Sequence, residues 1–158
     1  MSIHQFNKQQ ILPISLDTAW GFFSSPKNLV HITPPEMKFK VLTKLTDKNI
    51  HDGMLIEYAF KPFPGIRMKW KTRIDHVSHK FKFTDEQISG PYKMWEHTHT
   101  FTEITNGVLM IDTIYYQLPL GILGDIIHAM FIREKIKSIF CYRESTLTKL
   151  FMPNENRT

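Results

Sequence analysis

Hydrophobic and polar residues alternate along most of the middle of this chain, and a period of two is typical of β-strands with one buried face. The clearest run covers residues 67–77, where Met68, Trp70, Thr72 and Ile74 alternate with charged residues. The same pattern predicts further strands over residues 2–12, 38–45, 54–60, 81–87, 94–101 and 108–118, with Phe81 and Phe83 facing inward. About seven strands are therefore expected.

Proline and glycine separate these strands. Residues 61–65 read KPFPG and predict a loop, because proline offers no N–H to a strand ladder. Further turns are expected at residues 47–49 and 52–53. Asn106-Gly107 is a strong signal for a two-residue hairpin between the last two strands.

Helical patterns occupy the two ends of the chain. Residues 18–23 predict a short helix capped by Ser15 or Asp17, and residues 27–32 predict a second one. From Ile122 to Phe151, apolar residues recur at helical spacing, at Ile126, Met130, Ile136, Ile139, Phe140, Leu147, Leu150 and Phe151. The order of elements predicts an α+β fold, in which a curved antiparallel sheet of about seven strands surrounds the C-terminal helix and leaves a cavity between them. With neither repeat nor linker, residues 1–152 are expected to form a single domain, and residues 153–158 a disordered tail.

The strand after the Gly90-Pro91 turn carries two histidines on its buried face. Trp95, His97, His99 and Phe101 share that face, and the hairpin adds Asp112, Ile114 and Tyr116 to it; the expected opposite pairs are Phe101 with Asp112, His99 with Ile114, and His97 with Tyr116. This register places Asp112 diagonal to His99. Because a buried carboxylate is costly unless it is paired, the pattern predicts an Asp112–His99 pair.

Three interpretations of this group stay open. Asp112 is a possible third ligand beside the two histidines, although the rest of a metal motif is missing and no metal is expected. Alternatively, Asp112 fixes the tautomer of one imidazole and leaves its other nitrogen for a ligand in an apolar cavity. In the third interpretation the histidines bond only to neighbours such as Tyr116. The Asp85-Glu86-Gln87 triplet reads as a hydrogen-bonded turn element, and Cys141 as a packed thiol.

Cysteine content, apolar runs and net charge limit the cellular compartment and the classes of partner that are expected. The single cysteine excludes an internal disulfide and favours a reducing compartment, and the absence of a signal peptide or a long apolar run favours a cytoplasmic protein without an integral membrane segment. The net charge of +5 is compatible with anionic partners, but the basic residues are scattered and no nucleic-acid-binding motif is present. Neither nucleic acid nor a cofactor is expected, and the oligomeric state is left open.

The stretch FTDEQISGPYKMWEHTHTF, residues 83–101, resembles the pattern FxDEQxxGPYxxWxHxHxF of an uncharacterised subgroup of the SRPBCC superfamily. This superfamily is also called START-like or Bet-v-1-like and includes polyketide cyclase/dehydrase-like proteins. Downstream, DTIYYQLPLG is similar to the same subgroup, with Ile114 where valine is usual. The resemblance covers nearly the whole chain. It implies a helix-grip fold whose cavity takes a lipid-, polyketide- or isoprenoid-like molecule, and some relatives cyclise polyketides.

The expected function is therefore to bind a hydrophobic small molecule, more in the manner of a carrier than of an enzyme. The candidate ligand-binding residues are His97, His99, Asp112, Trp95, Tyr116, Trp70, Phe83, Phe101 and Met130. The alternative is a cyclase- or dehydratase-like enzyme in which His97 or His99 is the general acid/base; no catalytic residue is assigned. A weaker alternative is a regulator that binds a protein partner through exposed Met130 and Phe131.

Overall fold

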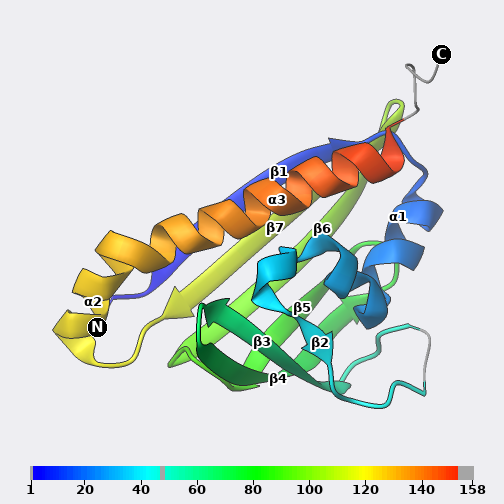
Figure 1. The fold of residues 1–158 in the computed structure, drawn as a ribbon. Helices are drawn as coiled ribbons and strands as arrows, with labels where there is room; N and C mark the ends of the chain where they lie inside the picture. Colours follow the sequence, from blue (N-terminus) through cyan, green and yellow to red (C-terminus); the bar gives the residue numbers. More distant parts are fainter. Residues whose placement is uncertain (1, 47–48, 153–158) are drawn as a thin grey trace.

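A computed structural model describes residues 2–46 and 49–152 of the chain. Its centre is a seven-stranded antiparallel sheet, as the sequence predicts (Figure 1). The strand order is β1-β7-β6-β5-β4-β3-β2. The strands are β1 (His4–Leu12), β2 (Lys40–Val41), β3 (Leu55–Phe63), β4 (Ile66–Ser78), β5 (Lys82–Ser89), β6 (Met94–Ile104) and β7 (Gly107–Gln117). The predicted turn at residues 47–49 and the predicted tail at 153–158 lie wholly or partly outside the described residues.

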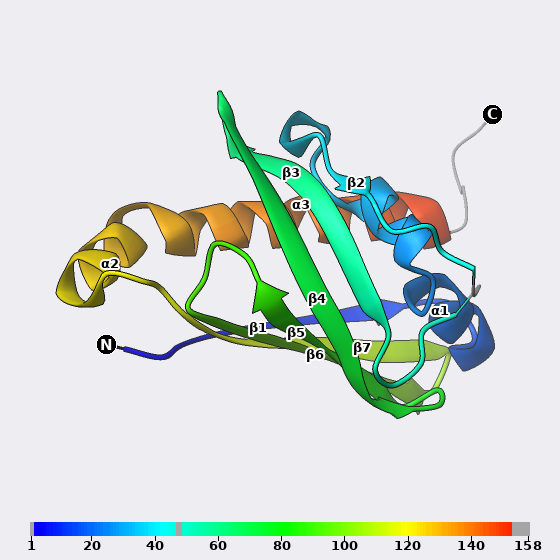
Figure 2. The same ribbon diagram turned by 90° about the horizontal axis from the view of Figure 1, so that it is seen from below.

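Helical segments connect β1 to β2 and end the chain. The first group is α1 (Leu16–Phe23) and the 3-10 helices η1 (Pro26–Ile32) and η2 (Pro35–Met37). Ser15 caps α1, because its Oγ accepts a hydrogen bond from the backbone N–H of Thr18. The C-terminal helix consists of α2 (Gly121–Ile127), the π-helical segment η3 (His128–Ile132) and α3 (Arg133–Phe151). Figure 2 shows β3 and β4 crossing the line of α3, so that the sheet curves around the helix.

The register of the β6–β7 hairpin differs from the predicted one by two residues. The turn is Thr105-Asn106, and Ile104 pairs with Gly107. A Cβ on Gly107 would lie 2.4 Å from the carbonyl oxygen of Leu12, so glycine is needed as the first strand residue for close approach to β1. Asn106 itself adopts the left-handed conformation, with φ +67°.

The corrected register keeps every side chain on its predicted face, because a shift of two residues preserves the alternation of a strand. His99 now lies directly opposite Asp112, where the prediction placed it diagonally. His97 lies opposite Ile114, and Trp95 opposite Tyr116.

The loop predicted at residues 61–65 was wrong for its first three residues, because β3 continues to Phe63 and only residues 64–65 form the turn before β4 begins at Ile66. β2 pairs only with Tyr58 and Ala59, which leaves the second half of β3 as an edge. Pro62 is tolerated there because an edge strand has no neighbour that requires its N–H. The register of β3 with β4 also shifts between Phe60 and Phe63.

Three smaller predictions were also wrong. The strand predicted at residues 38–45 is reduced to Lys40–Val41, since Lys38 adopts a left-handed conformation that ends η2. Phe81 is 50% exposed because it precedes the first residue of β5, whereas Phe83 is buried. Cys141 is exposed, because the next position around α3 from buried Phe140 faces outward.

The buried side of α3 consists of Ile136, Phe140, Arg143 and Leu147, which follow one another at helical spacing. Of the predicted apolar stripe, Ile126, Met130 and Leu150 are exposed instead. A charged residue thus occupies a buried position on the helix that faces the sheet. In the described part of the chain, no helix combines the length and the apolar character needed to cross a bilayer.

Candidate functional site

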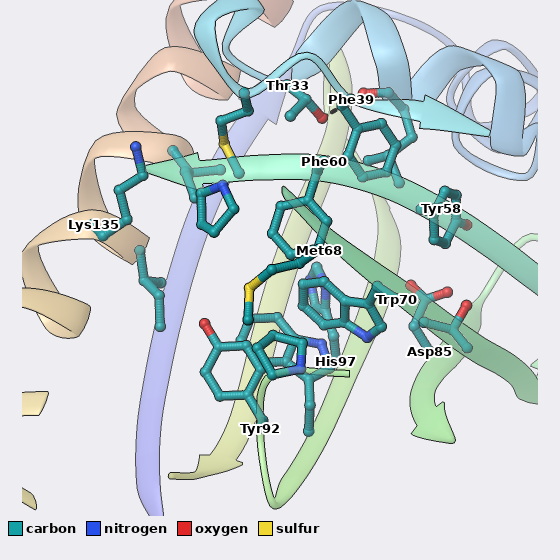
Figure 3. Close-up of a pocket in the computed structure, with 18 of the residues that line it drawn as sticks. Thr33, Phe39, Tyr58, Phe60, Met68, Trp70, Asp85, Tyr92, His97 and Lys135 are labelled. Carbon is teal, nitrogen blue, oxygen red and sulfur yellow. Dashed lines mark hydrogen bonds between the residues drawn. The ribbon is translucent and has the colours of Figure 1, made fainter. Parts of the chain in front are cut away.

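A cavity of about 390 Å³ lies between the sheet and the C-terminal helix. A volume of this size is within the range of small-molecule sites. Figure 3 shows side chains from β3, β4, β5, β6 and α3 around it, with Met68 and Trp70 near the centre of the view and Lys135 at one side. Its apolar wall includes Ile32, Phe39, Ile56, Phe60, Trp70, Phe83, Trp95 and Ile139.

A buried polar cluster meets the cavity on its β6 side. His97 Nε2 lies 2.7 Å from Asp112 Oδ1, and His99 Nδ1 lies 2.9 Å from the same oxygen. The other nitrogen of His99, Nε2, lies 2.8 Å from Asp85 Oδ2. The contact of His99 Nδ1 is poorly aligned for a hydrogen bond, so the attraction there is mainly ionic. Arg143 Nη1 completes the group at 3.7 Å from Asp112 Oδ1.

The two imidazoles have opposite pKa shifts. Burial, reinforced by the charge of His99, lowers the pKa of His97 to about 4. Burial also acts to lower the pKa of His99, but its bonds to Asp112 and Asp85 outweigh burial and raise it. At neutral pH His97 is therefore neutral, while the contacts of His99 favour its protonated form.

Asp112 is ionised although it is buried. Burial by itself would raise the pKa of this carboxyl, but the hydrogen bond from His97 and the charge of His99 hold it well below its ordinary value. Burial also lowers the pKa of Arg143, while Asp112 and Asp85 act to raise it, and a guanidinium stays charged in proteins. In this arrangement a protonated His99 and the Arg143 guanidinium balance the two carboxylates that His99 contacts.

The neighbours of Gln87 explain part of the FxDEQxxGPY stretch. The Gln87 amide donates to the carbonyl oxygen of Tyr92 at 2.7 Å, and its oxygen accepts from the Tyr92 N–H at 3.3 Å. A Cβ on Gly90 would lie 2.4 Å from that same oxygen. Glu86 binds Arg73 on the other face of the strand. Gln87 thus fixes the backbone of the Gly90-Pro91-Tyr92 turn through two hydrogen bonds to Tyr92. Only Asp85 of the triplet joins the polar cluster.

The structure gathers five of the predicted site residues around the cavity: Trp70, Phe83, Trp95, His97 and His99. Asp112 contacts both of these histidines but is not itself part of the cavity wall. Phe101 packs against Trp20 and Phe23 in the main core.

Two predicted residues lie elsewhere. The hydroxyl of Tyr116 shares a hydrogen bond of 2.7 Å with Nε2 of His128, not with the β6 histidines. Met130 is 62% exposed on η3 and is not part of the cavity wall.

Arg143 and the role of Asp85 were missed in the sequence. Arg143 lies three residues after Phe140 and four before Leu147, which is the spacing of the buried side of the helix. The signal in the sequence was therefore a charged residue at a position where the helical pattern expects an apolar one. Asp85 pairs with His97 in the β5–β6 register and reaches the neighbouring His99. The contact between Asp85 and His99 depends on the register of β5 against β6, and the alternation of residues along each strand does not specify that register.

A metal centre would use Asp85 in place of the predicted Asp112. The ligand atoms of Asp85, His97 and His99 lie within 4.8 Å of one another. A divalent cation there would displace the His99 proton, and the cluster, with Arg143 included, would then carry one net positive charge. The charge balance therefore favours the proton over a metal.

No protein-family model matches the sequence, and no curated protein matches it. Solved structures do match. Protein CV1439 from Chromobacterium violaceum is 14% identical with a TM-score of 0.72, covering 95% of this chain and 99% of its own. Ginseng major latex-like protein 151 is 13% identical with a TM-score of 0.70, covering 96% and 99%. A START superfamily protein from Mycobacterium smegmatis is 13% identical with a TM-score of 0.67, covering 93% and 99%.

These similarities define the class of fold. The chain has the helix-grip architecture shared by Bet v 1-like and START proteins, with an open antiparallel sheet and a long C-terminal helix. The resemblance found in the sequence is confirmed at the level of the fold.

Proposed function

We propose that this protein binds a hydrophobic small molecule in the cavity between its sheet and its C-terminal helix. The observation that carries the proposal is the cavity itself, of about 390 Å³ and walled mainly by aliphatic and aromatic side chains. Such a wall binds an apolar body by excluding water from it, while a few polar groups orient the ligand. The single cysteine and the absence of a membrane-spanning helix among the described residues support the cytoplasm as the proposed location.

A competition assay with a neutral fluorescent probe tests this proposal. Phenylnaphthylamine is expected to fluoresce on entering the cavity and to be displaced by long-chain apolar compounds. Ile139→Trp fills the cavity from α3 and should abolish the signal. Leu150→Trp is the matched control, since Leu150 is exposed on the same helix outside the cavity wall. Equal binding by both variants would contradict the proposal.

The second candidate function is acid–base catalysis by His97. The His97–Asp112 pair lies at the cavity and has the arrangement of an oriented imidazole base. However, a pKa of about 4 makes His97 a weak base at neutral pH. Binding is therefore the better-supported function. Recovery of a chemically altered ligand after incubation with the protein, and of an unaltered one with His97→Gln, would favour the enzyme instead.

A further inference from the structure

Arg143 has donors that the protein does not use. Its side chain is 8% exposed and belongs to the cavity wall. Nε and Nη1 are buried and have no hydrogen-bond acceptor among the described residues. The Asp112 oxygen nearest to Nη1 is 3.7 Å away, which is too far for a hydrogen bond. The guanidinium lies instead over the ring of Phe140, 4.7 Å from its centroid.

The nearby carboxylates are already engaged by the histidines. Asp112 Oδ1 lies within 3 Å of both imidazoles, and Asp85 binds His99. Arg143 therefore supplies the charge that balances the cluster, while its Nε and Nη1 groups donate to none of the described residues. Because buried donors are normally satisfied, these free N–H groups indicate a missing acceptor.

A second unused donor lies in the same wall. Nε1 of Trp70, on β4, is buried and has no acceptor in the described part of the chain. Trp70 packs edge-on against Trp95, which belongs to the same wall. Thr72, also on β4 and in this wall, has a buried hydroxyl that can donate or accept. The unused N–H groups at the cavity are thus donors from two facing elements, α3 and β4. A ligand that matches them carries oxygen acceptors.

The charge of the cluster selects among such ligands. Asp85 and Asp112 are balanced by His99 and Arg143, so a ligand with a net charge would disturb a buried neutral group. A carboxylate would also lie near two carboxylates of the protein. An uncharged carbonyl oxygen accepts from a guanidinium without adding charge.

We propose that Arg143 anchors the ligand by donating to an uncharged carbonyl oxygen, so that the ligand is a ketone or ester with a long apolar body. This proposal rests on the proposed function, since it names the ligand class of the same cavity. A hydrogen bond to a charged donor in a buried site corresponds to a preference of about tenfold or more over a ligand without the acceptor.

Three compounds with matched chains test the proposal by displacement of phenylnaphthylamine. The first is a methyl ketone with an undecyl chain. The second is the alkene in which a methylene group replaces the ketone oxygen, and the third is the straight-chain carboxylic acid of the same length. The unaltered protein should bind the ketone about tenfold or more tightly than the alkene, and more tightly than the acid at neutral pH.

Arg143→Met should reduce the ratio of ketone affinity to alkene affinity from about tenfold or more to about one. Arg143→Met leaves a buried carboxylate without its counter-charge. The double variant Asp112→Asn/Arg143→Met removes that carboxylate as well, and it should show the same loss of preference for the ketone. A ketone preference that survives in a folded variant would overturn the anchor, as would tighter binding of the acid by the unaltered protein. Equal binding of all three compounds would overturn the anchor alone, whereas binding of none would also overturn the proposed function.

Discussion

At the level of single residues, the polar cluster of Asp85, His97, His99, Asp112 and Arg143 brings charged side chains into the interior of the protein. Asp112 is 3% exposed, and its carboxylate tolerates burial because two imidazoles contact one of its oxygens. The alternation of β6 and β7 was enough to predict that Asp112 and the histidines share the buried face. The partners of His99 were only half predicted, because Asp85 reaches it from β5.

The first prediction concerns the pairing of Asp112. Asp112→Asn should lower the free energy of unfolding by about 3 kcal/mol, because it removes the charge that both histidines contact. A double-mutant cycle with His99→Gln should give a coupling energy of about 1–3 kcal/mol in urea denaturation. Glu134→Gln removes an exposed ion pair with Lys137 and should have no measurable effect. A coupling energy near zero would show that Asp112 and His99 do not form a pair.

The second prediction concerns pH. The pKa of His97 is about 4 in the folded protein, against about 6.5 in an unfolded chain. Between these values the unfolded state takes up the proton first, so stability should fall as the pH drops from 6.5 to 4. The contribution of His97 is about 3 kcal/mol over that interval. The raised pKa of His99 has the opposite effect on stability. Its stabilising contribution is complete below pH 6.5 and is lost as the pH rises through the pKa of the folded state.

His97→Gln should therefore flatten the decline of stability between pH 6.5 and 4, measured by urea denaturation at a series of pH values. His31→Gln, on the exposed side of η1, is the control and should keep the slope of the unaltered protein. A slope unchanged by His97→Gln would contradict the assignment of a neutral, buried His97.

Among the secondary-structure elements, the β6–β7 hairpin explains why the predicted register was two residues off. Asn106-Gly107 suggested that both residues form the turn, but Gly107 is the first residue of β7. Its glycine is needed because the end of β1 passes close by, which is a tertiary contact. A local signal therefore identified the hairpin correctly and placed its turn incorrectly. The loop expected at residues 61–65 was wrong at its first three residues for a similar reason, since the tolerance for Pro62 depends on how short β2 is.

The third prediction tests this interpretation of Gly107. Gly107→Ala should destabilise the protein by about 2 kcal/mol or more, because the added Cβ meets a backbone oxygen that cannot move alone. Gly21→Ala is the matched control within α1, where a Cβ meets nothing within 4 Å. That variant should stabilise by about 0.5–1 kcal/mol, as expected for alanine in a helix. If thermal unfolding shows Gly107→Ala to be as stable as the unaltered protein, the close approach to Leu12 is not rigid.

For the whole molecule, strand alternation, turn residues and the C-terminal helical pattern, together with the family resemblance, were sufficient to predict the class of fold. They were not sufficient to predict the size of the cavity, because core and cavity walls use the same apolar side chains. Arg143 was missed because a charged residue on a helix is usually assigned to the solvent side. Its burial becomes understandable only when β5, β6, β7 and α3 are brought together around Asp112.

Native mass spectrometry of the protein, purified gently from the cells that make it, tests the binding function most directly. The unaltered protein and Leu150→Trp should each carry one small organic molecule, which is released unchanged on denaturation. Ile139→Trp, whose added ring occupies the cavity, should be found without it. Two results would contradict binding in this cavity. In the first, all three proteins show the mass of the bare chain alone; in the second, Ile139→Trp carries the same bound molecule as the unaltered protein.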